Sequence, residues 1–319
     1  MKPPYEITAE ILSLYGQIKE LLGQCISLLL VRPEARLRRQ NRIKTIHSSL
    51  AIEGNTLDIG QITAILENSR VIGPKKDVLE VKNAIAAYDR LSLLDSCSMQ
   101  DFLLAHKTLM NGLVNNPGTF RTRQVGVLHG SEVKHVAPPH KIIPGLMREL
   151  FDYLLTDNDL TIIKGCVFHY EIEFIHPFDD GNGRMGRLWH TRLLMDEHPV
   201  FEFIPIEDSI RQNQQEYYKT LAISDKAGNS TAFIEFMLAI IRNSLKETVE
   251  ETRLPSIDFE KRSENALANL TDWFDRKDYM KLNKGISSAT ASRDLKHLLE
   301  AGRLEVSGEG RMTRYRKKD

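Results

Sequence analysis

Apolar residues recur at three- and four-residue spacing through most of the first 250 residues, as is typical of amphipathic α-helices. Three segments carry this spacing clearly: Ile11, Leu12, Tyr15, Ile18, Leu21 and Leu22; then Leu150, Phe151, Leu154 and Leu155; then Phe233, Phe236, Met237 and Ile240. The pattern therefore predicts a mainly α-helical fold.

The helical pattern is interrupted between residues 117 and 144. This region holds several residues that break helices: Gly118, Gly126, Gly130, Pro138 and Pro139. Valines at 125, 127, 133 and 136 favour two short strands on either side of the sequence HGS at 129–131. We expect a β-hairpin on a helical scaffold, with an ordinary surface loop as the alternative.

The C-terminal region has its own organisation. The polar segment 251–256 separates two regions of different composition, and we interpret it as a linker. In the tail, residues 257–319, a helix near 287–301 ends at Gly302, and two short strands flank 307–310. A helix followed by a hairpin resembles a small winged helix-turn-helix domain.

The charge of the tail differs from that of the whole chain. The 319 residues carry 43 Lys and Arg against 43 Asp and Glu, whereas residues 276–319 carry 12 basic and 6 acidic residues. We expect residues 257–319 to contact DNA, with protein docking as the alternative. The residues that would face phosphates are Ser287, Ser288, Thr290, Ser292 and Arg293 of the helix and Arg311, Arg314 and Arg316 of the hairpin.

Membrane insertion and disulfide chemistry find no support in the sequence. The longest apolar run, 25–31, falls short of the roughly 20 residues that span a bilayer, and the first residues form no signal peptide. Cys25, Cys97 and Cys166 are widely separated and form no CxxC pair. The sequence therefore predicts a cytoplasmic protein without a membrane partner.

The residues best suited to chemistry lie at 176–187, with the sequence HPFDDGNGRMGR. Pro177 forces the preceding helix to end, so His176 lies at a helix–loop junction. Gly181 and Gly183 let backbone N–H groups converge, and a helix that begins near Asn182 adds its positive end. This arrangement is typical of a phosphate-binding helix N-terminus.

Charged side chains surround this N-terminus. Arg184 and Arg187 lie in the first helical turn, where the helix dipole opposes them and an anionic ligand would remove the conflict. Asp180 supplies one carboxylate, which suits Mg²⁺ completed by phosphate oxygens and water. Together with His176 as a general base, these residues are the parts of a phosphate-transfer site.

Each of these residues alone has a purely structural explanation. The combination of all of them in twelve positions favours a phosphate-transfer site. A metal site built from His169, His176 and Asp180 is disfavoured, because this spacing is not an established zinc pattern and two arginines would repel the ion. The chain contains no GxxxxGK[ST] motif, so a P-loop nucleotide site is excluded.

Residues 176–187 resemble the signature of Fic-domain proteins, HPFx[D/E]GNGRxxR, at every specified position, and Glu173 and Ile175 suit its usual lead-in. The resemblance covers about residues 30–247. It implies an N-terminal helical segment (1–110) and a helical Fic catalytic core (111–250). It also implies a protein adenylyltransferase, which moves AMP from ATP to a Ser, Thr or Tyr hydroxyl of a target protein.

The resemblance also implies a role for each signature residue. His176 would deprotonate the target hydroxyl, and Asp180 would bind Mg²⁺. The phosphates would be held by Asn182, Gly183, Arg184 and Arg187, with the two arginines on the β- and γ-phosphates. The hydroxyl would attack the α-phosphate and pyrophosphate would leave.

Two further regions fit the family. The hairpin at 120–136 resembles the flap, which would hold a segment of the target protein as an added strand. Asn213, Tyr217 and Tyr218 lie where family members build the adenine pocket, although tyrosines at this spacing suit helix packing equally well.

An acidic residue near the N-terminus suggests inhibition. Ser49 and Glu53 share one helix face, Gly54 follows as a helix stop, and Glu53 meets the unfavourable end of the helix dipole. An ion pair with a nearby cation of the 36–44 region would explain this. The run also resembles the [S/T]xxxE[G/N] inhibitory helix of some Fic proteins, in which the glutamate pairs with the second signature arginine, here Arg187, and ATP binds unproductively.

Two rival functions remain open in the sequence. The same residues would serve to remove AMP from a modified protein, with Glu53 positioning a water. Alternatively, the chain would be a DNA-binding regulator whose Fic domain senses a nucleotide. A homodimer is compatible with the sequence.

Overall fold

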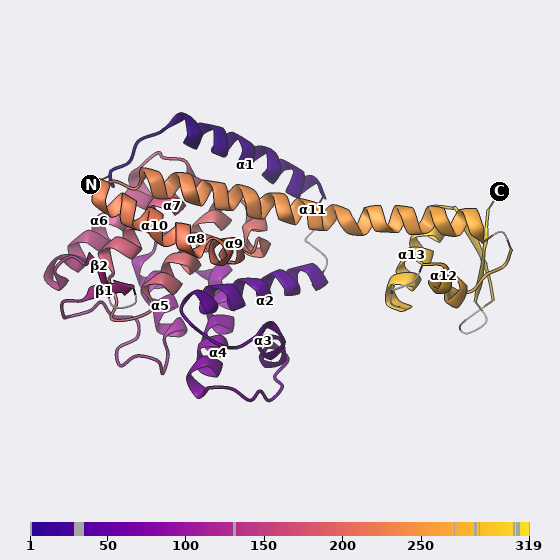
Figure 1. Cartoon of the computed structure of the whole chain (residues 1–319), viewed down its shortest axis with the longest axis horizontal. Coiled ribbons are helices and arrows are strands. Elements are labelled where there is room, and N and C mark those ends of the chain that lie inside the picture. The colour runs from indigo at the N-terminus through magenta and orange to yellow at the C-terminus, as the bar shows by residue number, and fades with distance from the viewer. Residues whose placement is uncertain are drawn as a thin grey trace. The chain divides into compact units, whose positions relative to one another are not determined.

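Helices dominate the fold, in agreement with the apolar spacing. The computed structural model describes residues 2–28, 35–129, 132–270, 272–283, 286, 288–308, 310 and 313–318. The chain forms two compact units, Met1–Thr248 and Val249–Asp319 (Figure 1). The segment 1–110 and the region 111–250 of the sequence analysis thus pack in one unit up to residue 248.

The first unit contains ten helices in full among its described residues, together with the first part of an eleventh. They are α1 (Ala9–Leu28), α2 (Ala35–Ile52), α3 (Ile59–Leu66), α4 (Lys75–Arg90), α5 (Met99–Leu109), α6 (Ile143–Thr156), α7 (Thr161–Ile175), α8 (Asn182–Glu197), α9 (Ile206–Gln212), α10 (Gln214–Ala227) and α11 (Thr231–Asn269). Short 3₁₀ turns occur at η1 (Leu91–Leu93), η2 (His140–Ile142) and η3 (Pro199–Phe203). Helices α7 and α8 pack against each other, and α2 packs on α9 and α8.

An aromatic core anchors the loop between α7 and α8. Phe102 of α5 makes edge contacts with Phe168 of α7 and Trp189 of α8, at centroid distances of 5.7 and 5.2 Å. It also stacks on Phe178 of the loop at 5.6 Å. Because Phe178 is fully buried, the loop is fixed to the core at its centre.

The predicted hairpin is present. β1 (Gly126–His129) pairs antiparallel with β2 (Glu132–Val136), from Gly126 opposite Val136 to His129 opposite Glu132, with an irregularity between residues 127 and 128. Residues 130 and 131 of the turn lie outside the described residues.

Helix α1 lies along the first part of α11 (Figure 1). Just before α1, the backbone N–H of Glu6 donates to Thr231 Oγ1 at 2.9 Å, and at the far end the Cys25 thiol lies 3.9 Å from the Leu245 carbonyl oxygen. No helix among the described residues is both long and apolar enough to cross a bilayer.

The second unit contains the end of α11, α12 (Arg276–Leu282), α13 (Ser288–Glu300) and an antiparallel pair, β3 (Leu304–Ser307) with β4 (Arg314–Lys317). Its core is formed by Ala266, Leu267, Phe274, Tyr279, Ala291, Leu295, Leu298 and Leu304. Two residues predicted to face DNA, Ser287 and Arg311, lie outside the described residues.

The predicted linker at 251–256 requires a correction, because these residues lie within α11 and are helical. The change in composition marks the boundary between the two units and does not mark a break in the helix. Proline at 255 usually ends a helix, yet the helix continues to Asn269.

Candidate active site

The signature residues form the loop between α7 and α8 and the first turns of α8. Helix α7 ends at Ile175, and His176 follows in a left-handed backbone conformation with φ 49° and ψ 61°. Gly181, at φ 88°, reverses the chain before α8 begins at Asn182. Left-handed conformations are uncommon outside glycine and concentrate at functional sites. His176 thus lies at the start of the loop and the N-terminus of α8 at its end.

The side chain of Asn182 holds the loop from within. Its Oδ1 accepts a hydrogen bond from the Phe178 N–H at 2.8 Å, and its Nδ2 donates to the Phe178 carbonyl at 3.0 Å. The side chain is buried and committed to the loop backbone. A phosphate contact at Asn182 would therefore come from its backbone N–H.

His106 of α5 supports the same loop. Its ring stacks on Phe178 with centroids 3.6 Å apart, and its Nδ1 accepts from the Gly118 N–H at 2.8 Å. Its Nε2 lies 3.1 Å from the Asp180 carbonyl oxygen and therefore carries the proton in the neutral ring. Burial lowers the pKa of His106 to about 4, which keeps the ring neutral near pH 7.

Arg121 ties the base of the hairpin to the loop. Its Nε donates to the His176 carbonyl at 2.8 Å and its Nη2 to the Pro138 carbonyl at 2.6 Å. Its backbone N–H donates to the Pro177 carbonyl at 2.9 Å. Burial lowers the pKa of Arg121. The hairpin and the His176 peptide are thus positioned by one buried guanidinium.

The N-terminus of α8 leaves no room for side chains at two glycines. A Cβ at Gly183 would lie 2.5 Å from Glu53 Oε1 and 3.1 Å from Arg187 Nη1, and a Cβ at Gly181 would lie 2.7 Å from Met110 Sδ. The carboxylate of Glu53 thus lies directly over Gly183. An anion already occupies the space next to the positive end of this helix.

Arg187 holds that carboxylate. Its Nη2 donates to Glu53 Oε1 at 2.7 Å and to the Ser49 carbonyl at 3.0 Å, and its Nε donates to Ser49 Oγ at 3.3 Å. Burial would lower the pKa of Arg187, but Glu53, Tyr217 and Glu173 together hold it above its usual value. Gly54, at φ 88°, turns the chain immediately after Glu53.

Glu53 pairs with a distant arginine and not with a cation of the 36–44 region, which was the local alternative. Two cations of α2, the helix that ends just before Glu53, pair with other residues, Arg39 with Glu67 and Arg42 with Asp89 at 2.5 Å. The partner of Glu53 is Arg187, 134 residues further along the chain.

Arg184 lies beside Arg187 and is also buried. Its Nη2 donates to Asp180 Oδ1 at 2.9 Å, and its Nη1 donates to Glu80 Oε1 at 3.1 Å. The Asp180 side chain is 50% exposed, so it is accessible from solvent while it contacts the arginine. The Glu80 side chain, on α4, is 7% exposed.

The three residues predicted for the adenine pocket differ in burial in the structure: Tyr217, Tyr218 and Asn213. Tyr217 is buried in the core, where its hydroxyl donates to Glu173 Oε1 at 3.2 Å and lies 3.0 Å from His169 Nε2. This placement supports the packing role for Tyr217. Tyr218 is half-buried, and burial, followed by the negative charge of Glu53, raises the pKa of its hydroxyl. Asn213 is exposed between α9 and α10.

Glu173 of α7 lies against the first turns of α8, where its Oε1 would be 3.5 Å from a Cβ at Gly183 and 3.2 Å from a Cβ at Gly186. Burial raises the pKa of Glu173 to about 7, and although Arg187 opposes this, Glu53 adds to it. Among the residues that the structure describes, no group of three or more His, Cys, Asp and Glu residues is placed to hold a metal ion. Asp180 accepts from the Gly181 N–H next to the N-terminus of α8, where Glu53 also lies.

Sequence reasoning missed Glu80, His106 and Arg121. Each acts on the signature loop or its arginines from another element, and none belongs to a motif of its own. A weak signal existed for Glu80, since a carboxylate on a helix that also carries apolar residues at helical spacing becomes buried only if it has a partner.

The sequence and the fold of this chain are similar to those of known proteins. The model of the Fic/DOC family matches residues 96–194. A crystal structure of a Fic family protein from Desulfovibrio desulfuricans G20 is 36% identical, with a TM-score of 0.76, and the match covers 100% of this chain and 98% of that one. This chain belongs to the Fic family. A solved fragment of Fic-1 from Caenorhabditis elegans, 22% identical with a TM-score of 0.61 over 76% of this chain and 73% of that one, shares the fold.

Curated relatives of this Fic chain are longer than it is. Protein adenylyltransferase fic-1 of Caenorhabditis elegans is 29% identical over 215 residues, which are 63% of this chain and 40% of the relative. Protein adenylyltransferase Fic of Nematostella vectensis is 28% identical over 260 residues, which are 77% of this chain and 56% of the relative. The Fic chain therefore spans about two fifths to just over half of the length of these relatives.

Proposed function

We propose that this Fic protein is a protein adenylyltransferase that transfers AMP from ATP to a hydroxyl side chain of a target protein, and that Glu53 inhibits it. The observation that carries the proposal is the Glu53 carboxylate, which lies over Gly183 and on Arg187 where an anionic ligand is expected. The names of the curated relatives, protein adenylyltransferases, support the activity. The test is AMP incorporation from labelled ATP, described in the Discussion.

In this mechanism His176 acts as the general base. It takes the proton of the target hydroxyl while the hydroxyl oxygen attacks the α-phosphate, and pyrophosphate leaves. The carbonyl of His176 accepts a hydrogen bond from Arg121 Nε, which fixes this peptide at the end of α7. The hairpin around 120–136 would present the target segment as an added strand.

The phosphates would bind at the N-terminus of α8 and on the two buried arginines. The backbone N–H groups of Asn182 and Gly183 point from the first turn of the helix, and Arg184 and Arg187 provide charged donors for the β- and γ-phosphates. For Arg187 to bind a phosphate fully, Glu53 has to leave it. Tyr218 and Asn213 are proposed for the adenine pocket, whereas Tyr217 packs behind it.

Asp180 fits the residue that would hold Mg²⁺. It is a single, half-exposed carboxylate next to the N-terminus of α8, and Mg²⁺ usually takes one or two protein carboxylates with phosphate oxygens and water. The ion would neutralise phosphate charge. Both Oδ1 contacts of Asp180, from Gly181 N–H and Arg184, orient the carboxylate beside the site.

Replacing Asp180 with alanine should weaken Mg²⁺-dependent ATP binding and AMP transfer together, by at least about tenfold. Calorimetry with ATP, with and without Mg²⁺, measures the binding. The matched control is Asp179→Ala, because Asp179 is the neighbouring exposed carboxylate and pairs with Arg123. An unchanged Mg²⁺ dependence in Asp180→Ala would remove Asp180 from the metal site.

We further propose that the second unit is a winged helix that binds DNA. Exposed cations on its surface support this: Lys277, Arg293, Arg314, Lys317 and Lys318. Arg316 is less available, since it pairs with Glu305 and lies over the Trp273 ring at 4.9 Å.

The separate free cysteines Cys25, Cys97 and Cys166 support a reducing compartment such as the cytoplasm.

The affinity of the full chain for duplex DNA should fall steeply with added salt. If about four phosphates are neutralised, the logarithm of the binding constant falls by about 3.6 per decade of salt. Arg314→Ala combined with Lys317→Ala should reduce that slope, whereas the matched control Lys19→Ala with Lys44→Ala should not. No binding to random duplexes at low salt would favour protein docking.

A further inference from the structure

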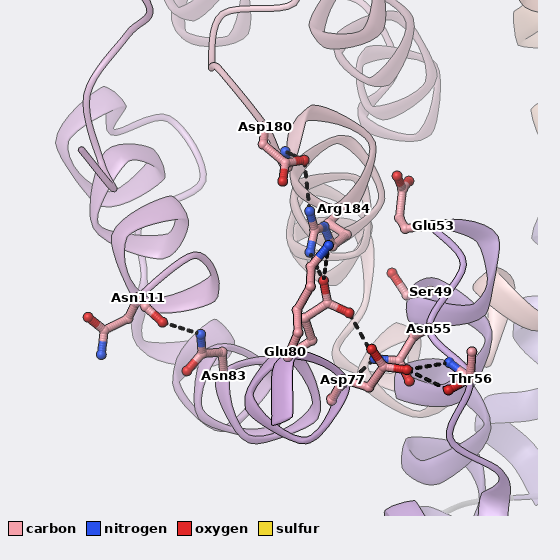
Figure 2. Close-up of polar contacts among 12 residues, drawn as sticks. Ser49, Glu53, Asn55, Thr56, Asp77, Glu80, Asn83, Asn111, Asp180 and Arg184 are labelled. Carbon is pink, nitrogen blue, oxygen red and sulfur yellow. Dashed lines mark hydrogen bonds and ion pairs between the residues drawn. The ribbon is translucent and has the colours of Figure 1, made fainter. Parts of the chain in front are cut away.

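Glu80 is a buried carboxylate that neither the signature nor the Ser49–Gly54 segment contains. It lies on α4, where Oε1 contacts Arg184 Nη1 at 3.1 Å and Oε2 accepts from Asn55 Nδ2 at 2.8 Å. Figure 2 shows it between Arg184 on one side and the chain just after Glu53 on the other. The only other cation near it among the described residues is Lys76, which is 70% exposed and 3.8 Å away.

The contacts of Arg184 divide between two sides of its guanidinium group. Nη1 is held by Glu80, while Nε and Nη2 share the opposite edge. On that edge Nη2 donates to Asp180, and the buried Nε has no partner among the residues that the structure describes. An unpaired buried donor is costly, so this edge is suited to accept an additional anion.

We propose that Glu80 is a positioning residue that holds Arg184 by Nη1 and so directs its Nε–Nη2 edge at the phosphates of ATP. This inference rests on the proposed function and assigns a residue to the same site. If Asp180 were to bind Mg²⁺ in the ATP complex, Arg184 would lose one of its two carboxylates, Asp180 and Glu80. Glu80 is the carboxylate that then keeps the guanidinium in place.

Asn55 fixes the Glu80 carboxylate in the position from which it contacts Arg184. Its Nδ2 also donates to the Asp77 carbonyl at 3.1 Å, and its Oδ1 accepts from the Leu57 N–H at 3.1 Å, so the amide has one fixed orientation. Thr56 is fixed next to it, since its N–H and hydroxyl both donate to Asp77 Oδ2, at 2.9 and 2.6 Å (Figure 2). Glu80 therefore cannot rotate away from Arg184 without also losing its hydrogen bond to Asn55.

Two other roles for Glu80 give different results. If it only neutralises a buried arginine, its loss would weaken binding of every nucleotide alike through general distortion of the site. If it competes with phosphate for Arg184, its loss would strengthen ATP binding. A positioning role predicts a selective loss, because Arg184 faces the β- and γ-phosphates, which AMP lacks.

The test compares Glu80→Gln and Glu80→Ala in a Glu53→Gly background, with Lys76→Ala as the matched control on the same helix. Calorimetry gives the affinity for ATP and for AMP with Mg²⁺, and steady-state kinetics give kcat and KM for ATP. We expect Glu80→Ala to lower ATP affinity and kcat/KM about tenfold to a hundredfold with AMP affinity unchanged, Glu80→Gln to lie between, and Lys76→Ala to match the background.

Equal losses for ATP and AMP, no change, or tighter ATP binding would each overturn the positioning role. Glu80→Gln preserves the shape of the side chain and keeps the test valid if Glu80→Ala fails to fold. A Glu53→Gly background that neither binds ATP nor transfers AMP would overturn the proposed function, and the positioning role with it. A background that binds ATP without transferring AMP would count against the proposed function alone, while the binding comparison still decides the role of Glu80.

Discussion

Glu53→Gly should raise AMP incorporation into protein by about tenfold to a hundredfold. Glu53 and the γ-phosphate both suit Arg187, and the two anions cannot engage its Nη2 fully at the same time. The substitution also clears the space over Gly183, where the carboxylate lies. The triphosphate can then settle with its α-phosphate in line for attack.

A control variant separates release of Arg187 from loosening of the helix end. Glu53→Ala removes the carboxylate without the flexibility of glycine, so it should activate similarly. Both variants leave Arg187 buried without its carboxylate partner, and we expect a lower melting temperature that Mg²⁺ and ATP restore. If the protein works mainly to remove AMP, both substitutions should lower activity, because a water would lose the group that positions it.

His176→Ala should reduce AMP transfer by about 10² to 10⁴-fold, the range that general bases contribute, while ATP binding stays nearly intact. The reason is that the base acts on the incoming hydroxyl, whereas ATP is held by α8 and the arginines. Transfer is measured by mass spectrometry of the target or of the protein itself, and binding by calorimetry. Full transfer activity in His176→Ala would show that the mechanism is wrong.

Local sequence signals were sufficient for much of the fold. Pro177 fixed the end of α7, Gly181 the reversal before α8, and the alternating valines the hairpin, because each acts through the backbone of its immediate neighbours. The prediction of a linker at 251–256 was wrong because it also rested on local composition alone. Polar composition there reported the change between the two units, while the helix itself continued.

The same difference between local and long-range signals applies to the candidate site. The loop and its arginines are contiguous in sequence, so their chemistry is visible in twelve residues. The pairing of Glu53 with Arg187 spans 134 positions, whereas local charge alone favoured a cation of the 36–44 region. Only the resemblance to a family pointed to Arg187.

The supporting residues had no such guide. Glu80, His106 and Arg121 reach the loop from α4, α5 and the segment before β1, and their roles depend on tertiary packing that periodicity does not specify. The same limit applies to Asn182, whose side chain binds the Phe178 backbone, and to Tyr217, whose hydroxyl is turned into the core.

The most direct test of the account is AMP incorporation from labelled ATP at equal Mg²⁺ for the wild type, Glu53→Gly, Glu53→Ala and Glu53→Gly combined with His176→Ala. The assay contains a host lysate, and mass spectrometry identifies the labelled proteins. We predict low labelling for the wild type, strong labelling for both single variants and none above background for the double variant. Equal labelling in all four proteins would contradict both the inhibitory role of Glu53 and the catalytic role of His176.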